Sequence, residues 1–545
     1  MKRKHVLLIL LSCAGISLAF KQVDDYFEVS KNLDIFTQVY KEVNLSYVDE
    51  VKPGKLIREA IDGMLYSLDP YTNFYSEAQA EDYRFQVTGS YGGIGANIRN
   101  MNGKLVVARV FEGFPAQLAD LRAGDILTQV DGKSVDGKSS SDLSDLLKGT
   151  AGTSVILTVD RPEIGEKNIT VERATIKVKN VPYFGMIDNK MGYVKLVGFT
   201  PDAGKEVQDA VVQLKRDGAE SIILDLRGNG GGLLHEAVNI VNVFVKKGQL
   251  IVSTRGKERE NDRLYKTLNS PVDTEIPLVV LIDEGSASAS EIVSGSIQDL
   301  DRGVVIGTKS FGKGLVQSTR MLTYNTQMKI TTAKYYTPSG RCIQRLDYAH
   351  KQNGKAVIVA DSLKHIFKTR NGREVTDGEG VTPDVAAGFS ELSKIGQSLL
   401  RNDLIFDFAT KYRNSHDAIN DPKSFNLTSQ DFQDFKNFLN GKDYSYETGT
   451  EKAIEALEKY SKVEEYHASM EANISVLKST LKVNKNTDID RHKTEIMNIL
   501  ETEVSSRYYF DRAMVESTFN YDPDIKSASE LFMNRVKYAK ILAGN

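Results

Sequence analysis

Between residues 192 and 300, short apolar strand patterns alternate with amphipathic helix patterns. In chain order, the expected elements cover residues 192–197, 201–216, 221–226, 233–245, 277–283 and 289–300. A helix between two strands carries the chain back to the starting edge of a sheet, so such strands lie parallel and helices cover the sheet faces. The alternation therefore predicts one layered α/β core with a parallel or mixed sheet.

The regions on either side of this core have other sequence patterns. Apolar residues at helical spacing, such as Leu33 and Phe36, predict a small helical domain before it. Short β-type runs separated by glycine predict a compact inserted domain with one helix at 141–148. Long helical patterns after residue 384 predict a helical appendage whose charged faces are solvated.

At 545 residues the chain is longer than one hydrophobic core supports, so several domains are expected. They cover 1–20 as a signal peptide or anchor, 21–86 as an N-terminal helical domain, 87–178 as the inserted β domain, 179–390 as the α/β core and 391–545 as a C-terminal helical region. For the C-terminal helices, oligomerisation of the chain with itself, docking to an adaptor and shielding of a cleft all stay open.

The N-terminus has the pattern of an export signal. Three basic residues at positions 2–4 precede an uncharged apolar run at 6–20. The run is short for a membrane span of about 20 residues. Cleavage after Ala19, lipidation at Cys13 in a bacterial lipoprotein box, and membrane attachment through an uncleaved anchor stay open. Each outcome places the protein in the bacterial periplasm or envelope.

Charge and cysteine content exclude other classes. The 70 basic and 73 acidic residues leave a net charge of −3, and no basic stripe is interleaved with aromatic residues, so nucleic acid is not expected as a partner. Cys13 and Cys342 are the two cysteines, so removal of the signal leaves no internal disulfide. Cys342 has no assigned base nearby in the sequence and is interpreted as a packed, unreactive thiol.

Ser288 is the candidate nucleophile. It follows the expected strand 277–283 and a Glu284-Gly285 turn, and it directly precedes the expected helix. A side chain at that corner stands beside free backbone N–H groups and the positive end of the helix dipole, which favour developing negative charge. The alternative is a serine that only caps the helix, because Ser286 and Ser290 stand close by.

A serine hydroxyl needs a base to become nucleophilic. His235 follows a glycine-rich loop, but a surface histidine explains that position equally well. Lys313 is the better candidate because Gly312 and Gly314 flank it, and a desolvated lysine can lose its proton near neutral pH. In a strand, Lys313 and Gln317 share one face, so the Gln317 amide could orient the amine.

Two glycine loops resemble nucleotide-binding motifs in part. The segment at 307–314 resembles a phosphate-binding loop, but Gly314 stands where Ser or Thr should bind magnesium, and a β pattern follows instead of a helix. The loop at 228–232 lacks the third glycine of a dinucleotide motif, since Leu233 stands there. Its backbone N–H groups suit half of an oxyanion hole, with a plain structural turn as the alternative. No cofactor or metal ion is expected.

Together these segments resemble the carboxyl-terminal processing, or tail-specific, protease family, over about residues 33–385. The matching motifs are Ser67 to Thr72, Asp225 to Asn229 with its glycines, Gly285 to Glu291, Phe311 to Gln317 and Gly380 to Asp384. The resemblance implies a crotonase-like α/β core with a Ser-Lys dyad and an inserted PDZ-like domain. By the same resemblance, Ser288 is the nucleophile, Lys313 the base and Gln317 its support. It implies oxyanion donors at Ala289 and Gly231, with Gly230 and Gly232 still open.

The inserted domain resembles a PDZ module through Tyr91 to Gly95, Phe114 to Ala116 and Gly124 to Leu127. Such a glycine loop holds a terminal carboxylate while a strand edge pairs with the peptide. The resemblance therefore implies substrate-binding residues at Tyr91, Gly93, Ile94 and Gly95. The alternative is that these glycines only form a turn between two strands.

The sequence predicts a serine endopeptidase that recognises protein or peptide substrates by their C-termini in the cell envelope. Two rivals stay open. One is a PDZ-bearing binding protein with an inactive core, which would bind peptides without cleaving them. The other is an acyl-CoA enzyme with the same core fold, which the export signal disfavours.

Overall fold

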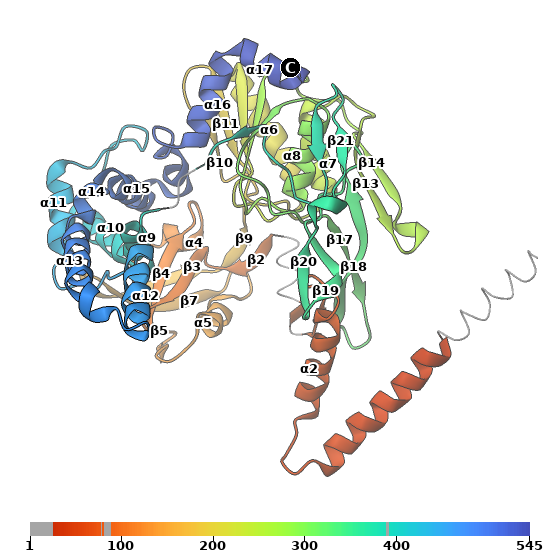
Figure 1. Cartoon of the computed structure of the whole chain (residues 1–545), viewed down its shortest axis with the longest axis horizontal. Coiled ribbons are helices and arrows are strands. Elements are labelled where there is room, and N and C mark those ends of the chain that lie inside the picture. Colours follow the sequence, from red (N-terminus) through yellow and green to blue (C-terminus); the bar gives the residue numbers. More distant parts are fainter. Residues whose placement is uncertain (1–25, 78, 81–88, 389–391, 545) are drawn as a thin grey trace, which may run out of the picture. The chain divides into compact units, whose positions relative to one another are not determined.

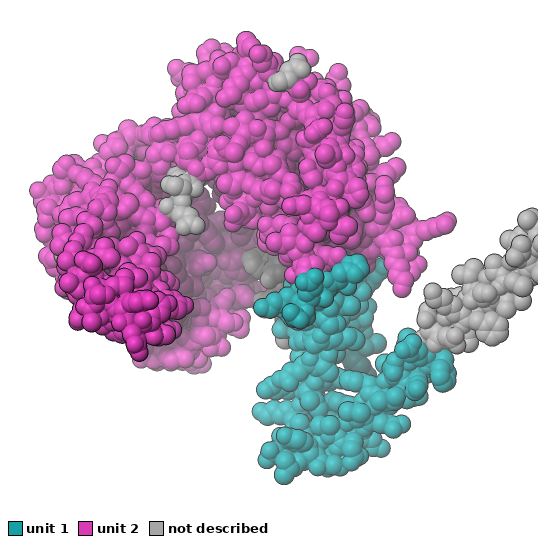
Figure 2. All heavy atoms as spheres, viewed as in Figure 1, with its two compact units in different colours: residues 1–80, 317–331, 348–355 teal, residues 81–316, 332–347, 356–545 magenta. Residues whose placement is uncertain are grey.

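The structure is a computed structural model that describes residues 26–77, 79–80, 89–388 and 392–544. The predicted signal segment, with Cys13 and Ala19, lies outside the described residues. The chain divides into two units: residues 1–80, 317–331 and 348–355, and residues 81–316, 332–347 and 356–545 (Figure 2). Within the described residues, no helix has the length and apolar character needed to cross a membrane.

The first unit is helical near its N-terminus, as the apolar spacing predicts. A helix covers residues 26–46, and α2 (Pro53–Tyr66) follows with proline at its start, where no N–H is needed. The short strand β1 (Asn73–Tyr75) pairs antiparallel with the beginning of β18 (Gln327–Tyr336). Arg58 ties α2 to β1, because its guanidinium donates to Phe74 O at 3.1 Å and lies over the Phe74 ring.

The second unit contains a six-stranded sheet in the order β10-β11-β12-β15-β16-β23. Its strands are β10 (Tyr183–Met186), β11 (Met191–Lys195), β12 (Ser221–Asp225), β15 (Leu278–Ile282), β16 (Val304–Gly307) and β23 (Val385–Ala386). β10 is antiparallel to β11, and the remaining neighbours are parallel. The predicted mixed α/β core is confirmed.

Helices cover both faces of this sheet. Successive side chains of a strand point to opposite faces, so Leu224 and Val280 pack against α6 (Ala203–Arg216), α7 (Leu234–Phe244) and α8 (Ala289–Asp299). The C-terminal helices α16 (Pro523–Met533) and α17 (Arg535–Ala543) lie on the other side of the sheet (Figure 1). Their apolar residues share a buried cluster with eight strand residues: Tyr183, Met191, Tyr193, Ile223, Val279, Leu281, Val304 and Ile306.

The helices α16 and α17, which belong to the predicted helical appendage, pack on the α/β core. Their apolar residues, including Ile525, Leu531 and Phe532, are buried against the sheet. Tyr538 Oη lies 3.0 Å from both Leu278 N and Leu278 O, which fixes α17 to β15. The sequence pattern identified the helices but not the sheet face that their apolar stripe covers.

The inserted β domain has its own core. Its main sheet contains β3 (Ala96–Met101), β4 (Lys104–Val110), β5 (Ile126–Val130), β7 (Ser154–Arg161) and β8 (Gly165–Glu172), with β6 (Lys133–Ser134) beside β5. β2 (Ser90–Gly93) pairs with β9 (Ala174–Lys177). The helices are α4 (Pro115–Leu118) and α5 (Ser140–Leu147). Arg161 and Asp125, each 1% exposed, form a buried ion pair at 2.7 Å, so both charges are compensated.

Smaller elements complete the chain. They are β13 (Leu250–Gly256), β14 (Arg263–Lys266), β17 (Leu315–Met321), β19 (Leu346–Gln352), β20 (Lys355–Ile358), β21 (Ile366–Lys368) and β22 (Glu374–Thr376). The C-terminal helical region contains α9 (Lys394–Arg401), α10 (Leu404–Ser415), α11 (Ser429–Phe438), α12 (Gly449–Val463), α13 (His467–Asn486), α14 (Asp488–Arg491) and α15 (Lys493–Glu516).

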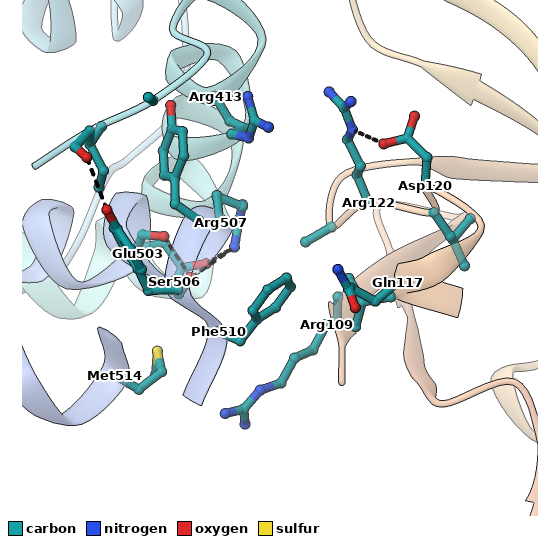
Figure 3. Close-up of a pocket in the computed structure, with 18 of the residues that line it drawn as sticks. Arg109, Gln117, Asp120, Arg122, Arg413, Glu503, Ser506, Arg507, Phe510 and Met514 are labelled. Carbon is teal, nitrogen blue, oxygen red and sulfur yellow. Dashed lines mark hydrogen bonds and ion pairs between the residues drawn. The ribbon is translucent and has the colours of Figure 1, made fainter. Parts of the chain in front are cut away.

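The helical region contacts the β domain. Arg99 donates to Asp403 at 2.8 Å, and Phe406 packs with Met101 and Val106. A cavity of about 480 Å³ lies between the two, lined by Arg109 among others from the β domain and by residues of α15 (Figure 3). The α15 backbone breaks at Phe510, whose ring packs on the β-domain core.

Because α16 packs on one face of the sheet, loss of a buried α16 side chain should destabilise the protein. Phe532→Ala should lower the free energy of unfolding by about 3–5 kcal/mol, because it leaves a cavity against the sheet. The neighbouring Met533, 76% exposed against 6% for Phe532, offers the matched control. Met533→Ala should change stability by no more than about 0.5 kcal/mol in the same denaturant titration. Equal losses of unfolding free energy in the two variants would contradict the packing of Phe532 against the sheet.

Candidate active site

Three neighbouring strands carry the three predicted motifs. The glycine loop at 228–232 follows β12, the turn with Ser288 follows β15, and the loop with Lys313 follows β16. Because these strands are adjacent and parallel, their carboxyl ends meet at one edge of the sheet. The fold thereby brings together segments that are far apart in the sequence.

Ser288 stands at the N-terminus of α8 in a strained backbone conformation, with φ 55° and ψ −109°. Such conformations in non-glycine residues cost about 1–3 kcal/mol and cluster at functional sites. The two flanking serines have structural bonds: Ser286 Oγ donates to Leu226 O at 2.9 Å, and Ser290 Oγ donates to Asn229 O at 2.8 Å. These bonds hold the turn against β12 and the glycine loop.

The glycine loop lies directly against the Ser288 turn. A Cβ atom at Gly231 would lie 2.8 Å from Ala289 N and 2.9 Å from Ser288 Cβ, and its φ is +97°, so only glycine fits there. Ala289 is the first residue of α8, and the first N–H groups of a helix have no intrahelical partner. The Gly231 N–H, however, donates to Asn229 Oδ1 at 2.9 Å.

Lys313 is half-buried in a loop whose glycines permit close packing. A Cβ at Gly312 would lie 2.5 Å from Arg345 Cβ, and one at Gly314 would lie 2.8 Å from Gln344 N. The Lys313 N–H donates to Glu291 Oε2 at 2.9 Å. The same oxygen accepts the Ser288 N–H at 2.8 Å, so one carboxylate joins the two motifs.

Glu291 is the residue whose place in the site the sequence analysis missed. It is fully buried, and it also accepts from Ser310 Oγ at 2.5 Å and from Gly312 N–H at 2.7 Å. Burial raises the pKa of Glu291 and its hydrogen bonds lower it, with a net value of about 7. The pattern Ser-x-x-Glu, a helix capping signature, was the available signal.

Gln317 lies on β17 and belongs to the first unit. Its amide Nε2 donates to Thr331 Oγ1 at 3.2 Å. The predicted support of Lys313 by this amide stays a prediction.

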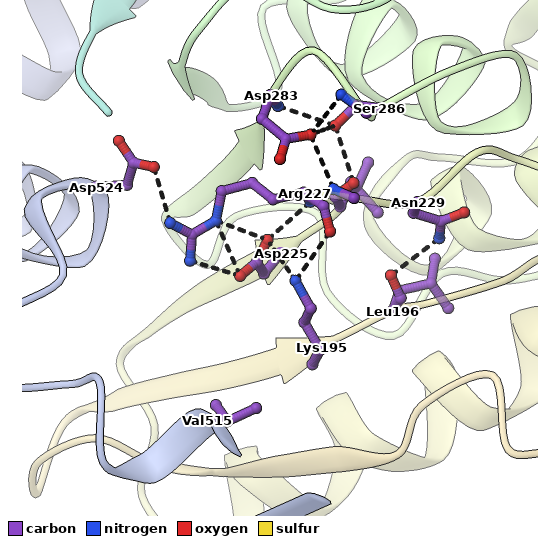
Figure 4. A network of polar contacts seen from close by, with 12 residues as sticks. Lys195, Leu196, Asp225, Arg227, Asn229, Asp283, Ser286, Val515 and Asp524 are labelled. Carbon is purple, nitrogen blue, oxygen red and sulfur yellow. Dashed lines mark hydrogen bonds and ion pairs between the residues drawn. The ribbon is translucent and has the colours of Figure 1, made fainter. Parts of the chain in front are cut away.

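Arg227 connects the start of the glycine loop to α16 (Figure 4). Its guanidinium lies 2.7 Å from Asp225, 2.8 Å from Asp522 and 2.8 Å from Asp524. Burial alone would raise the pKa of Asp225, but Arg227 and Lys195 hold it below its usual range. The C-terminal helices thus help to fix the backbone that leads into the candidate oxyanion loop.

The alternative catalytic groups are less suited to catalysis. The His235 side chain is 62% exposed, with Nε2 3.5 Å from Glu236 Oε1, which fits a surface histidine. Burial raises the pKa of the Cys342 thiol, which disfavours the reactive thiolate.

A second candidate site lies in the β domain. A cavity of about 440 Å³ is lined by Tyr91, Gly93 and Ile94 together with residues of β3 and α5. Gly95 does not line this cavity. Its φ is +79°, and a Cβ there would lie 2.4 Å from Phe114 Cβ, so this glycine serves the packing of the loop.

Comparison with known families gives three matches. Residues 190–349 match peptidase family S41, residues 106–161 match a PDZ domain, and residues 395–532 match the family "Probable PDZ-protease, C-terminal helical domain".

Two curated relatives and two solved structures are similar to parts of this chain. A carboxy-terminal-processing protease of Bartonella bacilliformis is 36% identical over 354 residues, or 64% of this chain and 79% of the relative. A probable CtpA-like serine protease of Staphylococcus aureus is 36% identical over 341 residues, or 61% of this chain and 66% of the relative. The photosystem II D1 C-terminal processing protease is 28% identical, with a TM-score of 0.36 over 65% of this chain and 92% of that one. The peptide-bound PDZ domain of a Vibrio cholerae carboxy-terminal protease is also 28% identical, with a TM-score of 0.16 over 16% of this chain and 99% of that one.

The S41 and PDZ matches agree with the α/β core and the β domain seen in the structure. The Bartonella relative exceeds 30% identity across most of its own length. The chain therefore belongs to peptidase family S41, as a serine-type peptidase of the carboxy-terminal-processing kind with a PDZ domain.

Proposed function

We propose that this protein is an endopeptidase of the cell envelope that binds the C-terminal ends of protein substrates and cleaves peptide bonds with a Ser288-Lys313 dyad. The observation that carries the proposal is the shared acceptor Glu291 Oε2, which receives the backbone N–H groups of both residues at 2.8 and 2.9 Å. That contact brings the backbones of the candidate nucleophile and the candidate base close together, which supports the proposed dyad.

The first chemical step is attack of Ser288 Oγ on the substrate carbonyl carbon. The neutral Lys313 amine accepts the hydroxyl proton, and Gln317 supports that amine. The Ala289 N–H, at the start of α8, donates to the oxyanion of the tetrahedral intermediate. Lys313 then returns the proton to the leaving amine, and an acyl-enzyme forms on Ser288.

The second step is hydrolysis of the acyl-enzyme. Lys313 accepts a proton from the attacking water, a second oxyanion forms in the same place, and Ser288 leaves with the proton. The reaction needs only these groups and water.

The glycine loop supplies the second oxyanion donor in this scheme. Gly231 can serve once its N–H turns away from Asn229 Oδ1, because glycine adopts backbone conformations that other residues do not. Gly230 and Gly232 are the alternative donors in the same loop.

Substitution of the dyad tests the mechanism. Ser288→Ala and Lys313→Ala should each lower cleavage of an unfolded test protein by at least about 10³-fold, because each removes one half of the proton transfer. Lys309→Ala is the matched control, since Lys309 is an ion-paired lysine of the same loop, 43% exposed. Its activity should stay near wild type. Mass spectrometry of the products measures the loss, and wild-type turnover in either dyad variant would refute the mechanism.

The cavity of the β domain supports recognition of chain ends. Apolar side chains such as Ile94, Ile98 and Leu147 line it, and Lys148 adds a positive charge. An apolar C-terminal side chain with its free carboxylate fits that chemistry, with β3 as the strand beside the peptide.

Peptide binding tests the recognition step. A peptide with a free C-terminus should bind the Ser288→Ala protein about 10- to 100-fold more tightly than the same peptide with an amidated end, because charge-assisted hydrogen bonds to the carboxylate are lost. Fluorescence anisotropy measures both dissociation constants. Equal affinities would exclude recognition through the terminal carboxylate.

The proposal that the protein is exported rests on the basic residues at 2–4 and the apolar run at 6–20. In a bacterial host, the full chain should fractionate with the envelope, whereas Leu10→Arg, which places a charge in the apolar run, should leave it in the cytoplasm. The mass of the mature protein then separates cleavage after Ala19, lipidation at Cys13 and retention of the anchor. Cytoplasmic recovery of the unaltered chain would contradict export.

A further inference from the structure

Glu291 is a buried acid that accepts hydrogen bonds from four donors. Its exposed fraction is 0%, and it lies in the first turn of α8, three residues after Ser288. Oε1 accepts from Ser310 Oγ and Gly312 N–H, and Oε2 accepts from Ser288 N–H and Lys313 N–H, at 2.5, 2.7, 2.8 and 2.9 Å respectively. The carboxylate therefore joins the nucleophile turn to three residues of the lysine loop.

Three of the four contacts require the carboxyl oxygens to be acceptors. Three of the donors are backbone N–H groups, which cannot reverse their role. A protonated carboxyl would have to direct its own O–H at Ser310 Oγ, the one partner that can accept. Ser310 Oγ also accepts the Val381 N–H at 2.7 Å, so the hydroxyl would then accept two bonds and its own O–H would lose its carboxylate acceptor. The ionised form is the one that satisfies the whole set.

Among the described residues, several titratable groups lie near this carboxylate or its loop. Tyr335 of β18 interacts with it electrostatically and donates its phenol to Ser288 O at 3.1 Å. Lys313 comes from the lysine loop itself. Farther along that loop, Lys309 is already paired with Glu379 at 3.0 Å, and Glu379 also pairs with Lys364. On the far side of Gly312, the Arg345 guanidinium lies over the Phe311 ring.

We propose that Glu291 is a positioning residue whose ionised carboxylate sets the separation of Ser288 and Lys313, and whose protonation loosens that link and lowers the rate of cleavage. The inference rests on the proposed dyad. Glu291 touches no substrate atom in this scheme, because it acts through the backbone of the two catalytic residues.

The sign of the pH dependence follows from the raised pKa. With a value of about 7, Glu291 is ionised above neutrality and becomes protonated as the pH falls. The kcat of the wild-type enzyme should therefore be highest above neutrality and decline through about pH 7. KM should change little, because the substrate-binding cavity of the β domain does not include Glu291.

Glu291→Gln is the decisive variant. The glutamine amide can donate to Ser310 Oγ, but its NH2 group then faces the Gly312 N–H, so two donors meet without an acceptor. The kcat at about pH 8.5 should therefore fall about tenfold, with KM nearly unchanged. Because glutamine does not titrate, the part of the kcat decline that is due to Glu291 should disappear in this variant. Glu291→Asp keeps a titrating carboxylate and should keep a decline on the acid side.

Ser310→Ala gives a second test that does not depend on how well Glu291→Gln folds. It removes one hydrogen bond that lowers the pKa of Glu291, so the decline in kcat should move to higher pH. Glu501→Gln is the matched control: burial also raises the pKa of Glu501, which accepts the Leu427 N–H in the helical region. That variant should keep the wild-type pH profile.

The outcomes separate the two proposals. A wild-type pH profile in Glu291→Gln, or an unshifted pH profile in Ser310→Ala, would overturn the role of Glu291. If Ser288→Ala still loses activity in that case, the dyad stays intact. Full activity in Ser288→Ala would instead overturn the dyad and, with it, this inference. A shifted profile in Ser310→Ala together with the flattened profile in Glu291→Gln supports the role of Glu291.

Discussion

Parallel pairing of β12, β15 and β16 is the constraint on which the site depends. Each strand ends at the same edge of the sheet, and each is followed by a segment that needs its own backbone geometry. The glycine loop, the strained Ser288 turn and the Lys313 loop could not meet if one strand ran the other way. The register of buried residues such as Leu224 and Val280 therefore fixes where the three loops meet, because a shift would turn these side chains away from the helices that they pack against.

The C-terminal helices are part of this arrangement. α16 buries Leu531 and Phe532 on one sheet face and supplies Asp522 and Asp524 to Arg227, just before the glycine loop. Removing one partner of such a buried ion pair costs about 3–5 kcal/mol, more than a surface pair contributes. A match to a helical-domain family over 395–532 therefore describes a sequence unit whose end is structurally part of the protease core.

Much of the fold could be predicted from the local spacing of apolar residues, because the core sequence has clear strand and helix periodicities. The expected helix at 289–300 corresponds to α8, and the expected strand at 277–283 corresponds to β15. The packing of α16, the bond from Gly231 to Asn229 and the three contacts of Glu291 with the lysine loop could not be predicted. Each depends on partners distant in the sequence or on the direction of one N–H group, which periodicity does not encode.

The position of α16 also bears on the order in which the enzyme is assembled. A ribosome makes Ser288 and Lys313 well before it makes residues 523–543. Until those residues emerge, the sheet face containing Ile223 and Leu281 lacks its cover, and Arg227 lacks two of its carboxylate partners. A growing chain thus carries the candidate active site on an incomplete scaffold until its last two helices are made.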